Sequence, residues 1–199
     1  LSEKANIENE EQWEFVIFEK RYYEMSSEQK QIYSVCALQP QSIVYNLPII
    51  LKMDGSINIE KMKQAYVSLV NRHSALRTQF VLHDSQIMQE VKDNLQVELE
   101  YETAEETDVE QIRKQFIRPF DLTKAPLIRM KLLKLKENEH ILMMDIHHIV
   151  CDGFSSIILV RDFLQFYETG RFEKQTNSYI DYSEKQNDLG WDKDFWMKE

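Results

Sequence analysis

The stretch Ile141-Leu142-Met143-Met144-Asp145-Ile146-His147-His148-Ile149-Val150-Cys151-Asp152-Gly153 joins an apolar run to two adjacent histidines and a short polar turn. Residues 141–146 are almost entirely apolar, which predicts a central strand covered on both faces. Successive side chains of a strand point to opposite faces, so we expect one histidine in the core and the other in a cleft beyond the strand end. Asp152 lies in the tight connection to the next helix, where Gly153 is expected to permit a backbone path that a Cβ would obstruct.

The segments around this stretch predict an α/β domain, an α+β two-layer sandwich with a mixed sheet flanked by helices. Apolar and β-rich runs predict strands at 45–53, 76–82, 86–91, 97–101, 128–132 and 141–146. Helical spacing and capping residues predict helices at 26–38, 58–72, 108–118 and 154–167. Ser26 and Asn58 are expected to cap the first two helices, and Gly170 to end the last. The second helix is expected to bury one face, made of Met62, Ala65, Tyr66, Leu69 and Val70.

The two ends of the chain are less regular. Residues 1–20 are rich in Glu and show little periodicity, so we expect a leader or linker there, followed by the folded part at 21–199. The tail carries aromatic and acidic residues, with one possible last helix. Residues 1–20 also lack the basic start and apolar stretch of a secretion signal.

Composition narrows the function further. The chain of 199 residues has 24 Lys and Arg against 34 Asp and Glu, a formal charge of −10. This acidic balance argues against nucleic acid and against an anionic membrane, since both select basic surfaces. No apolar run approaches the roughly 18–20 residues of a membrane span. The two cysteines, Cys36 and Cys151, do not form a disulfide framework, which favours a reducing, cytoplasmic location.

Several kinds of chemistry are open to the histidine pair. The two rings can be structural and hydrogen-bonded beside a helix cap. A metal site would draw its ligands from His140, His147, His148, Cys151 and Asp152, but adjacent histidines diverge on a strand and the usual ligand spacings are missing. A nucleophilic Cys151 is also open, although nothing marks it as activated. Phosphate-binding loops and Gly-x-Ser-x-Gly elbows are absent, which leaves an imidazole that accepts a proton during acyl transfer to an amine or hydroxyl.

The stretch 147–153 resembles the HHxxxDG signature of condensation domains in non-ribosomal peptide synthetases, relatives of chloramphenicol acetyltransferase. Four further segments resemble family motifs in the same order. The segment 72–80 is similar to RHxxLRTxF, and 23–33 to the opening helix motif, with Glu28 and Gln31 where Ala and Arg are usual. Segments 119–122 and 125–129 resemble the residues before the central strand. The segment 179–186 is similar to YxDYAxWQ, with Lys185 in place of the tryptophan.

The resemblance implies a chloramphenicol acetyltransferase-like fold and a set of site residues. Condensation domains have two lobes, so this chain is expected to be the N-terminal lobe alone, inactive without the second. His148 is expected to act at the reacting centre, and His147 to be structural. Asp152 is expected to form a buried ion pair with Arg77 or, as second choice, Arg72. Gly153 would offer backbone close to the thioester.

The resemblance also implies partners. Upstream and downstream peptidyl carrier domains would bring substrates on 4′-phosphopantetheine arms, beside an adenylation domain and the second lobe. No cofactor, nucleic acid or membrane is expected to bind the lobe directly. Intact histidines disfavour heterocyclising relatives. An epimerisation-type lobe, a non-catalytic carrier-docking lobe and a small trimeric acetyltransferase are the alternatives. The resemblance implies that adenylation domains largely choose the amino acids joined.

Overall fold

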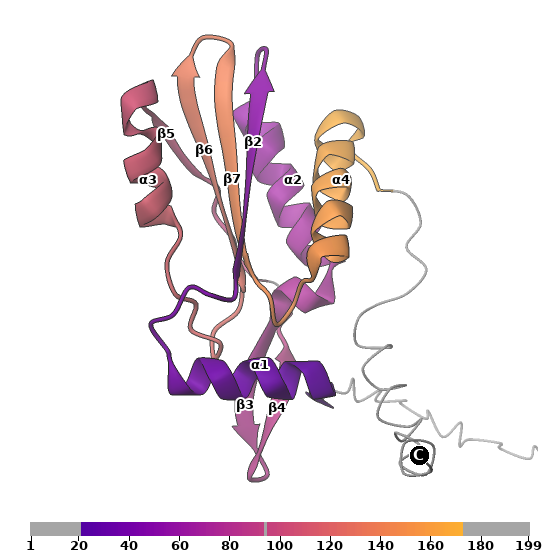
Figure 1. Cartoon of the computed structure of the whole chain (residues 1–199). Helices are drawn as coiled ribbons and strands as arrows, with labels where there is room; N and C mark the ends of the chain where they lie inside the picture. The colour runs from indigo at the N-terminus through magenta and orange to yellow at the C-terminus, as the bar shows by residue number, and fades with distance from the viewer. Residues whose placement is uncertain (1–20, 94, 173–199) are drawn as a thin grey trace, which may run out of the picture.

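A four-stranded mixed sheet forms the centre of the molecule (Figure 1). The computed structural model describes residues 21–93 and 95–172. The strands, in spatial order, are β2 (Asn46–Asp54), β7 (Glu139–His147), β6 (Ile128–Lys136) and β5 (Glu100–Thr103). Only the β5–β6 pair of this sheet is parallel. Strand β7 lies between β2 and β6 and is buried along most of its length, which confirms the predicted central strand.

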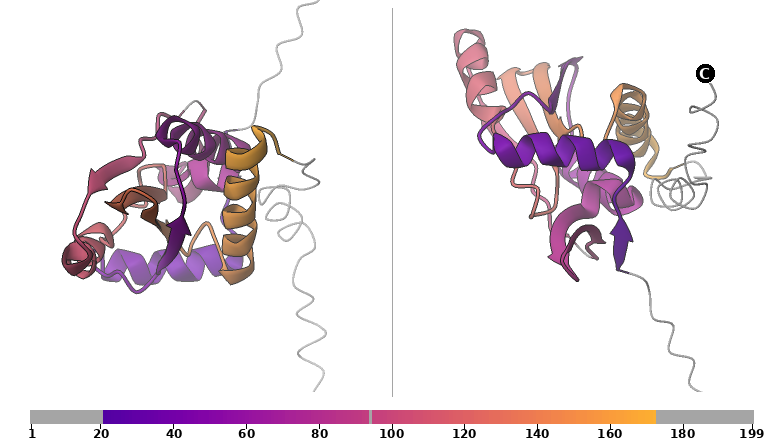
Figure 2. Two further views of the ribbon diagram at one scale, coloured as in Figure 1. Left: turned by 90° about the horizontal axis from the view of Figure 1, so that it is seen from above. Right: turned by 60° about the horizontal axis from the view of Figure 1, so that its bottom comes forward.

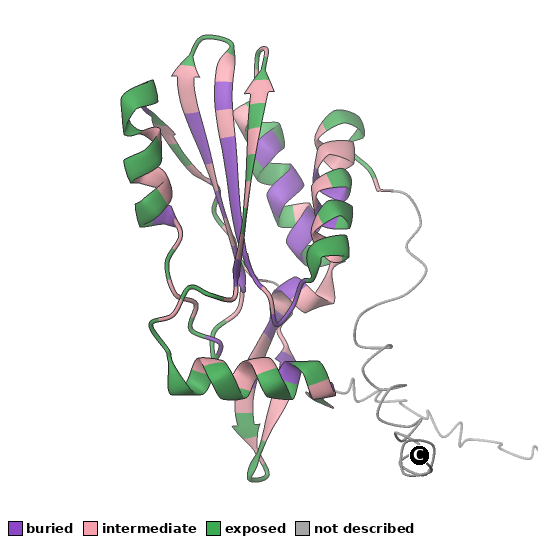
Figure 3. Ribbon diagram, in the orientation of Figure 1, coloured by how far each residue is buried: buried purple, intermediate pink, exposed green. Residues whose placement is uncertain are grey.

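Helices cover both faces of this sheet (Figures 1 and 2). Helices α2 (Ile59–Arg72) and α4 (Gly153–Thr169) lie side by side on one face. The shorter α3 (Val109–Phe116) covers the other, where its Phe116 packs against Leu133 and Met143. The purple bands of Figure 3 mark the buried core between the sheet and α2, which contains the five residues predicted from helical spacing: Met62, Ala65, Tyr66, Leu69 and Val70.

A second, three-stranded sheet lies below the first in the view of Figure 1. Its strands are β1 (Tyr22–Glu24), β4 (Gln86–Val91) and β3 (Thr78–His83), all antiparallel. Helix α1 (Ser27–Leu38) crosses this region. Ser26 caps α1 in a reciprocal capping box with Gln29, and Asn58 caps α2, so both predicted caps are confirmed.

Some predicted boundaries differ from the structure. The strand expected at 76–82 begins at Thr78, because residues 74–77 form a short 3-10 helix after α2. The strand expected at 97–101 lies at Glu100–Thr103. The half-buried strand expected at 128–132 is longer and runs to Lys136. Gly170 does end α4, in the left-handed conformation with φ 69° that glycine adopts without steric cost.

The predicted leader at residues 1–20 and the possible last helix lie outside the described residues. Within the described part, no helix is both long and apolar enough to span a bilayer.

Candidate active site

The two histidines occupy different surroundings at the end of β7, as predicted. His147 is the last residue of the strand and is buried, whereas His148 begins the following turn and is half-buried. The His147 N–H donates to Leu127 O (3.0 Å), and the His148 N–H donates to Tyr45 O (2.7 Å). These two bonds fix the backbone on which both rings are carried.

The hydrogen bonds of His147 determine its tautomer. The Ile149 N–H donates to Nδ1 of His147 (3.2 Å), so Nδ1 carries no proton in the neutral ring. The proton therefore lies on Nε2, 3.6 Å from Cys36 Sγ. Burial, followed by the charges of His148 and Arg129, lowers the pKa of His147 to about 4. His147 is thus neutral at pH 7, with both nitrogens engaged, which fits the predicted structural role.

His148 lies on the wall of a cavity of about 430 Å³. Helix α1 contributes one wall and the start of α4 another. The lining residues are Glu28, Gln29, Ile32, His148, Ile149, Val150, Cys151, Asp152 and Ser155. The Tyr45 ring meets His148 edge-on, with centroids 6.4 Å apart. A half-buried imidazole on a cavity wall can exchange a proton with a bound amine.

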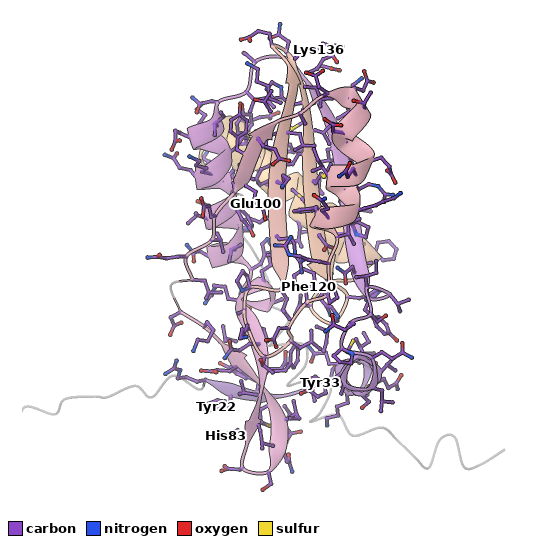
Figure 4. All side chains as sticks on the ribbon, turned by 90° about the vertical axis from the view of Figure 1, so that its left-hand side faces the viewer. Tyr22, Tyr33, His83, Glu100, Phe120 and Lys136 are labelled. Atoms are coloured by element: carbon purple, nitrogen blue, oxygen red, sulfur yellow. The ribbon has the colours of Figure 1, made fainter. Side chains whose placement is uncertain are left out.

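His147 lines a different cavity, of about 510 Å³. Its walls come from the second half of α1, the following residues 39–42 and residues 118–123. Figure 4 shows Tyr33 and Phe120, which both line it, at the base of the large sheet. The rings of His147 and Phe120 are nearly perpendicular, with centroids 5.9 Å apart. The predicted divergence of the histidines thus corresponds to two separate cavities.

Asp152 caps α4 and does not form the predicted ion pair. Its side chain is exposed, and Oδ1 accepts the Ser155 N–H (2.7 Å), which lowers the pKa of the carboxyl. Arg72 instead contacts Asp162 of α4 at 3.1 Å. Arg77 donates to Lys92 O and lies 3.8 Å from Asp93.

The predicted pair is therefore wrong for the described residues. The free N–H groups at the start of α4 bind the Asp152 carboxylate. Asp162, buried where α4 packs on α2, binds both Arg72 and His73, the latter at 3.0 Å. Spacing along the chain does not indicate which aspartate faces an arginine of another helix.

Replacing Asp152 distinguishes its role as a helix cap from a role in a buried ion pair. Asp152→Ala is expected to lower the free energy of unfolding by about 0.5–2 kcal/mol, whereas Asp152→Asn, which keeps an acceptor for the Ser155 N–H, loses a few tenths. Urea denaturation of the variants checks this. A loss of about 3–5 kcal/mol in both variants would indicate that Asp152 is half of a buried ion pair.

Gly153 does not need to be glycine for steric reasons. A Cβ built at Gly153 meets no heavy atom within 4 Å, and its φ lies outside the left-handed region. The expectation that a Cβ would obstruct the chain here is wrong, because the exposed start of α4 faces open space. Whether a substrate fills that space stays a prediction.

Neither His140 nor Cys151 has the surroundings of a reactive residue, although Cys151 lines the cavity of His148. His140 lies at the opposite end of β7 from His147. No group of three or more His, Cys, Asp or Glu within residues 21–93 and 95–172 is arranged to hold a metal ion. Burial, together with the charge of Asp152, raises the pKa of the Cys151 thiol to about 12, so the thiolate nucleophile is disfavoured.

Sequence reasoning missed a buried polar cluster beneath His147. Asp145 is fully buried; its Oδ2 accepts from Asn46 Nδ2 (2.8 Å) and lies 3.7 Å from Arg129 Nε. Burial raises the pKa of Asp145 to about 6, although Asn46 and Arg129 oppose the shift. The Arg129 guanidinium lies 3.7 Å from the centroid of the Phe120 ring. The sequence feature that could have indicated this cluster is the single carboxylate, Asp145, within an otherwise apolar strand.

The mixed sheet, the helices on its faces and the histidine pair at the end of its central strand define a chloramphenicol acetyltransferase-like fold. The condensation-domain family model matches residues 19–199, and the chain belongs to that family. It is 36% identical over 181 residues to bacitracin synthase 3 of Bacillus licheniformis, covering 91% of this chain and 3% of that protein. It is 34% identical over 181 residues to surfactin synthase subunit 2 of Bacillus subtilis (strain 168), covering 89% and 5%.

Solved structures agree on the fold. The starter condensation domain of rhizomide synthetase RzmA has a TM-score of 0.81 at 22% identity, covering 90% of this chain and 48% of that one. The X-domain in its complex with OxyB from teicoplanin biosynthesis has a TM-score of 0.76 at 24% identity, covering 87% and 40%. The chain thus spans less than half of these structures and a small part of the synthetases.

Proposed function

We propose that this chain is the N-terminal lobe of a condensation domain that joins an acceptor amine to a donor thioester, forming a peptide bond. The observation that carries the proposal is the position of His148. Its half-buried ring lines the 430 Å³ cavity where the central strand, α1 and the start of α4 meet.

In the proposed reaction, the α-amine of the acceptor attacks the carbonyl carbon of the donor thioester. The C–N bond forms, the C–S bond breaks, and the donor's thiol leaves. His148 accepts the proton lost by the amine and returns it to the departing thiolate, or holds the amine and the tetrahedral intermediate in place. His147 orients the turn through its bond from Ile149, and Asp152 fixes the start of α4.

The proposed partners follow from the family. Two carrier domains deliver the substrates as thioesters on 4′-phosphopantetheine arms, and the adenylation domain and second lobe belong to the same cytoplasmic synthetase. No cofactor is required on the lobe itself, because a thioester is already activated. This chain covers 41–48% of the solved starter condensation domains, which supports its assignment to one lobe of two.

A single-turnover assay tests the proposal. Donor- and acceptor-loaded carriers are mixed with the 199-residue chain, or with the chain joined to its second lobe, and acyl transfer is read by intact-protein mass spectrometry. We expect transfer only with both lobes present. Transfer by the short chain alone would contradict the two-lobe mechanism, and no transfer by either would contradict the condensation activity.

A carrier-docking lobe without catalysis is the second candidate. The X-domain, which has the same fold, was solved in complex with the protein OxyB, so a protein of this fold can serve as a binding partner. In that case loaded carriers would bind the two-lobed protein and the acyl group would stay on the donor.

A further inference from the structure

We propose that Gln29 of α1 is a positioning residue for His148, a role that rests on the proposed function. Gln29 is 1% exposed and lines the same cavity as His148. Its amide joins the start of α1, strand β4 and the turn that carries His148.

Three hydrogen bonds engage the Gln29 side-chain amide, one at its oxygen and one at each N–H. Oε1 accepts the Ser26 N–H (3.0 Å), while Nε2 donates to Gln89 Oε1 (2.9 Å) and to Ile149 O (3.2 Å). Gln89 Nε2 donates in turn to Glu24 O (2.9 Å), which leaves its Oε1 as the acceptor for Gln29. The network therefore fixes which end of each amide faces the turn.

Ile149 follows His148 directly, and its carbonyl, which Gln29 binds, belongs to the next peptide, so this bond restrains the turn one residue beyond His148. The turn is held by Tyr45 O at the His148 N–H and by His147 Nδ1 at the Ile149 N–H. Within the turn, the Val150 N–H donates to His147 O (3.1 Å) and the Cys151 N–H to His148 O (3.4 Å). Gln29 adds a bond from outside the turn, to the Ile149 carbonyl. Loss of this donor would let the turn move toward the cavity. A misplacement of about 1 Å in a reacting group can cost about 100-fold in rate.

Gln29→Glu separates this role from helix capping. A glutamate still accepts the Ser26 N–H, because Glu suits the same position of a capping box. It cannot donate to Ile149 O or to Gln89 when ionised. Ser26→Ala is the complementary variant, which removes the hydroxyl acceptor of the cap but keeps the Gln29 amide. Gln64→Glu, an exposed site on α2, makes the same chemical change away from the turn.

Amide hydrogen exchange of the 199-residue chain gives the first measurement. Exchange at His148, Val150 and Cys151, whose N–H groups are bonded within this region, is compared with exchange at Met144 in the core. In Gln29→Glu we expect the amide exchange rate in the turn, divided by the rate at Met144, to rise at least about tenfold. Ser26→Ala and Gln64→Glu should leave the ratio within about twofold. An unchanged ratio in Gln29→Glu would overturn the proposal and limit Gln29 to capping.

Kinetics of the two-lobed enzyme give the second measurement. Gln29→Glu is expected to lower kcat about 10- to 100-fold and to change KM for the loaded carriers less than about threefold. A rise in KM at constant kcat would contradict a role in positioning His148. If the wild-type enzyme makes no peptide bond, the proposed function fails while the exchange result still reports whether Gln29 holds the turn.

Discussion

His148→Ala in the two-lobed enzyme is expected to slow peptide-bond formation by about 10²- to 10⁴-fold, the usual contribution of a positioned acid–base group. The ring lines the cavity formed by α1 and the turn, and we expect its removal to leave β7 folded, because His148 follows the end of that strand. Single-turnover transfer between loaded carriers, read by mass spectrometry, measures the loss. Carrier binding should change little, because the proposed role of His148 is at the reacting atoms and not in binding the carriers.

His83→Ala is the matched control for this variant. His83 ends β3, at the tip of the β3–β4 hairpin, and stacks on Tyr22 with centroids 4.0 Å apart (Figure 4). Its loss is expected to change the transfer rate less than about twofold. Equal rates for His148→Ala and the wild-type enzyme would contradict the role of His148 in the reaction.

Asp145→Asn is expected to gain about 3 kcal/mol in stability relative to the wild type between pH 3.5 and pH 7. Burial raises the pKa of Asp145 from 3.8 to about 6, so the folded state retains a proton that the unfolded state has released. Wild-type stability from this carboxyl is complete below its ordinary pKa and falls as the pH rises through 6. The asparagine cannot ionise and avoids this loss.

Urea denaturation of both proteins across that pH range measures the difference. The attraction of Arg129 for the ionised carboxylate is already included in the pKa of Asp145. The difference between a neutral carboxyl and an amide does not vary with pH, so the pH trend is the informative quantity. A difference independent of pH would show that Asp145 titrates normally.

His147 acts in the opposite direction over nearly the same pH range. Its pKa is lowered from 6.5 to about 4, so the unfolded state binds the proton first and stability is lost as the pH falls below 6.5. In the wild type the two groups partly offset each other between about pH 4 and 6. Of these two groups, Asp145→Asn leaves only the histidine. As the pH is lowered from 6 to 4, the free energy of unfolding should therefore fall more in this variant than in the wild type.

The local elements could be predicted because their signals are local. Asn58 and the helical spacing of α2 lie within 15 consecutive residues, and each of its five predicted core residues is buried. The strand at the histidine pair could be predicted for the same reason. The start of β3 could not, because residues 74–77 form a 3-10 turn whose apolar residues fit a strand equally well.

The site was predicted in part. The opposite surroundings of His147 and His148 follow from strand geometry, whereas the partners of Asp152, Arg72 and Arg77 depend on how elements pack. Gln29 lies in a motif that the sequence shows. Its hydrogen bond to Ile149 could not be predicted from the sequence, because the two residues are far apart in the chain.

The pairing of β2 with β7 has a consequence for the synthesis of the protein. Asn46 pairs with His147 and Asp54 with Glu139, so the partner of β2 leaves the ribosome roughly 90 residues later, after about 5–20 seconds of translation. During that interval an apolar strand is present without its ladder. The large sheet must therefore assemble late, and the turn that carries His148 acquires its shape among the last parts of the described chain.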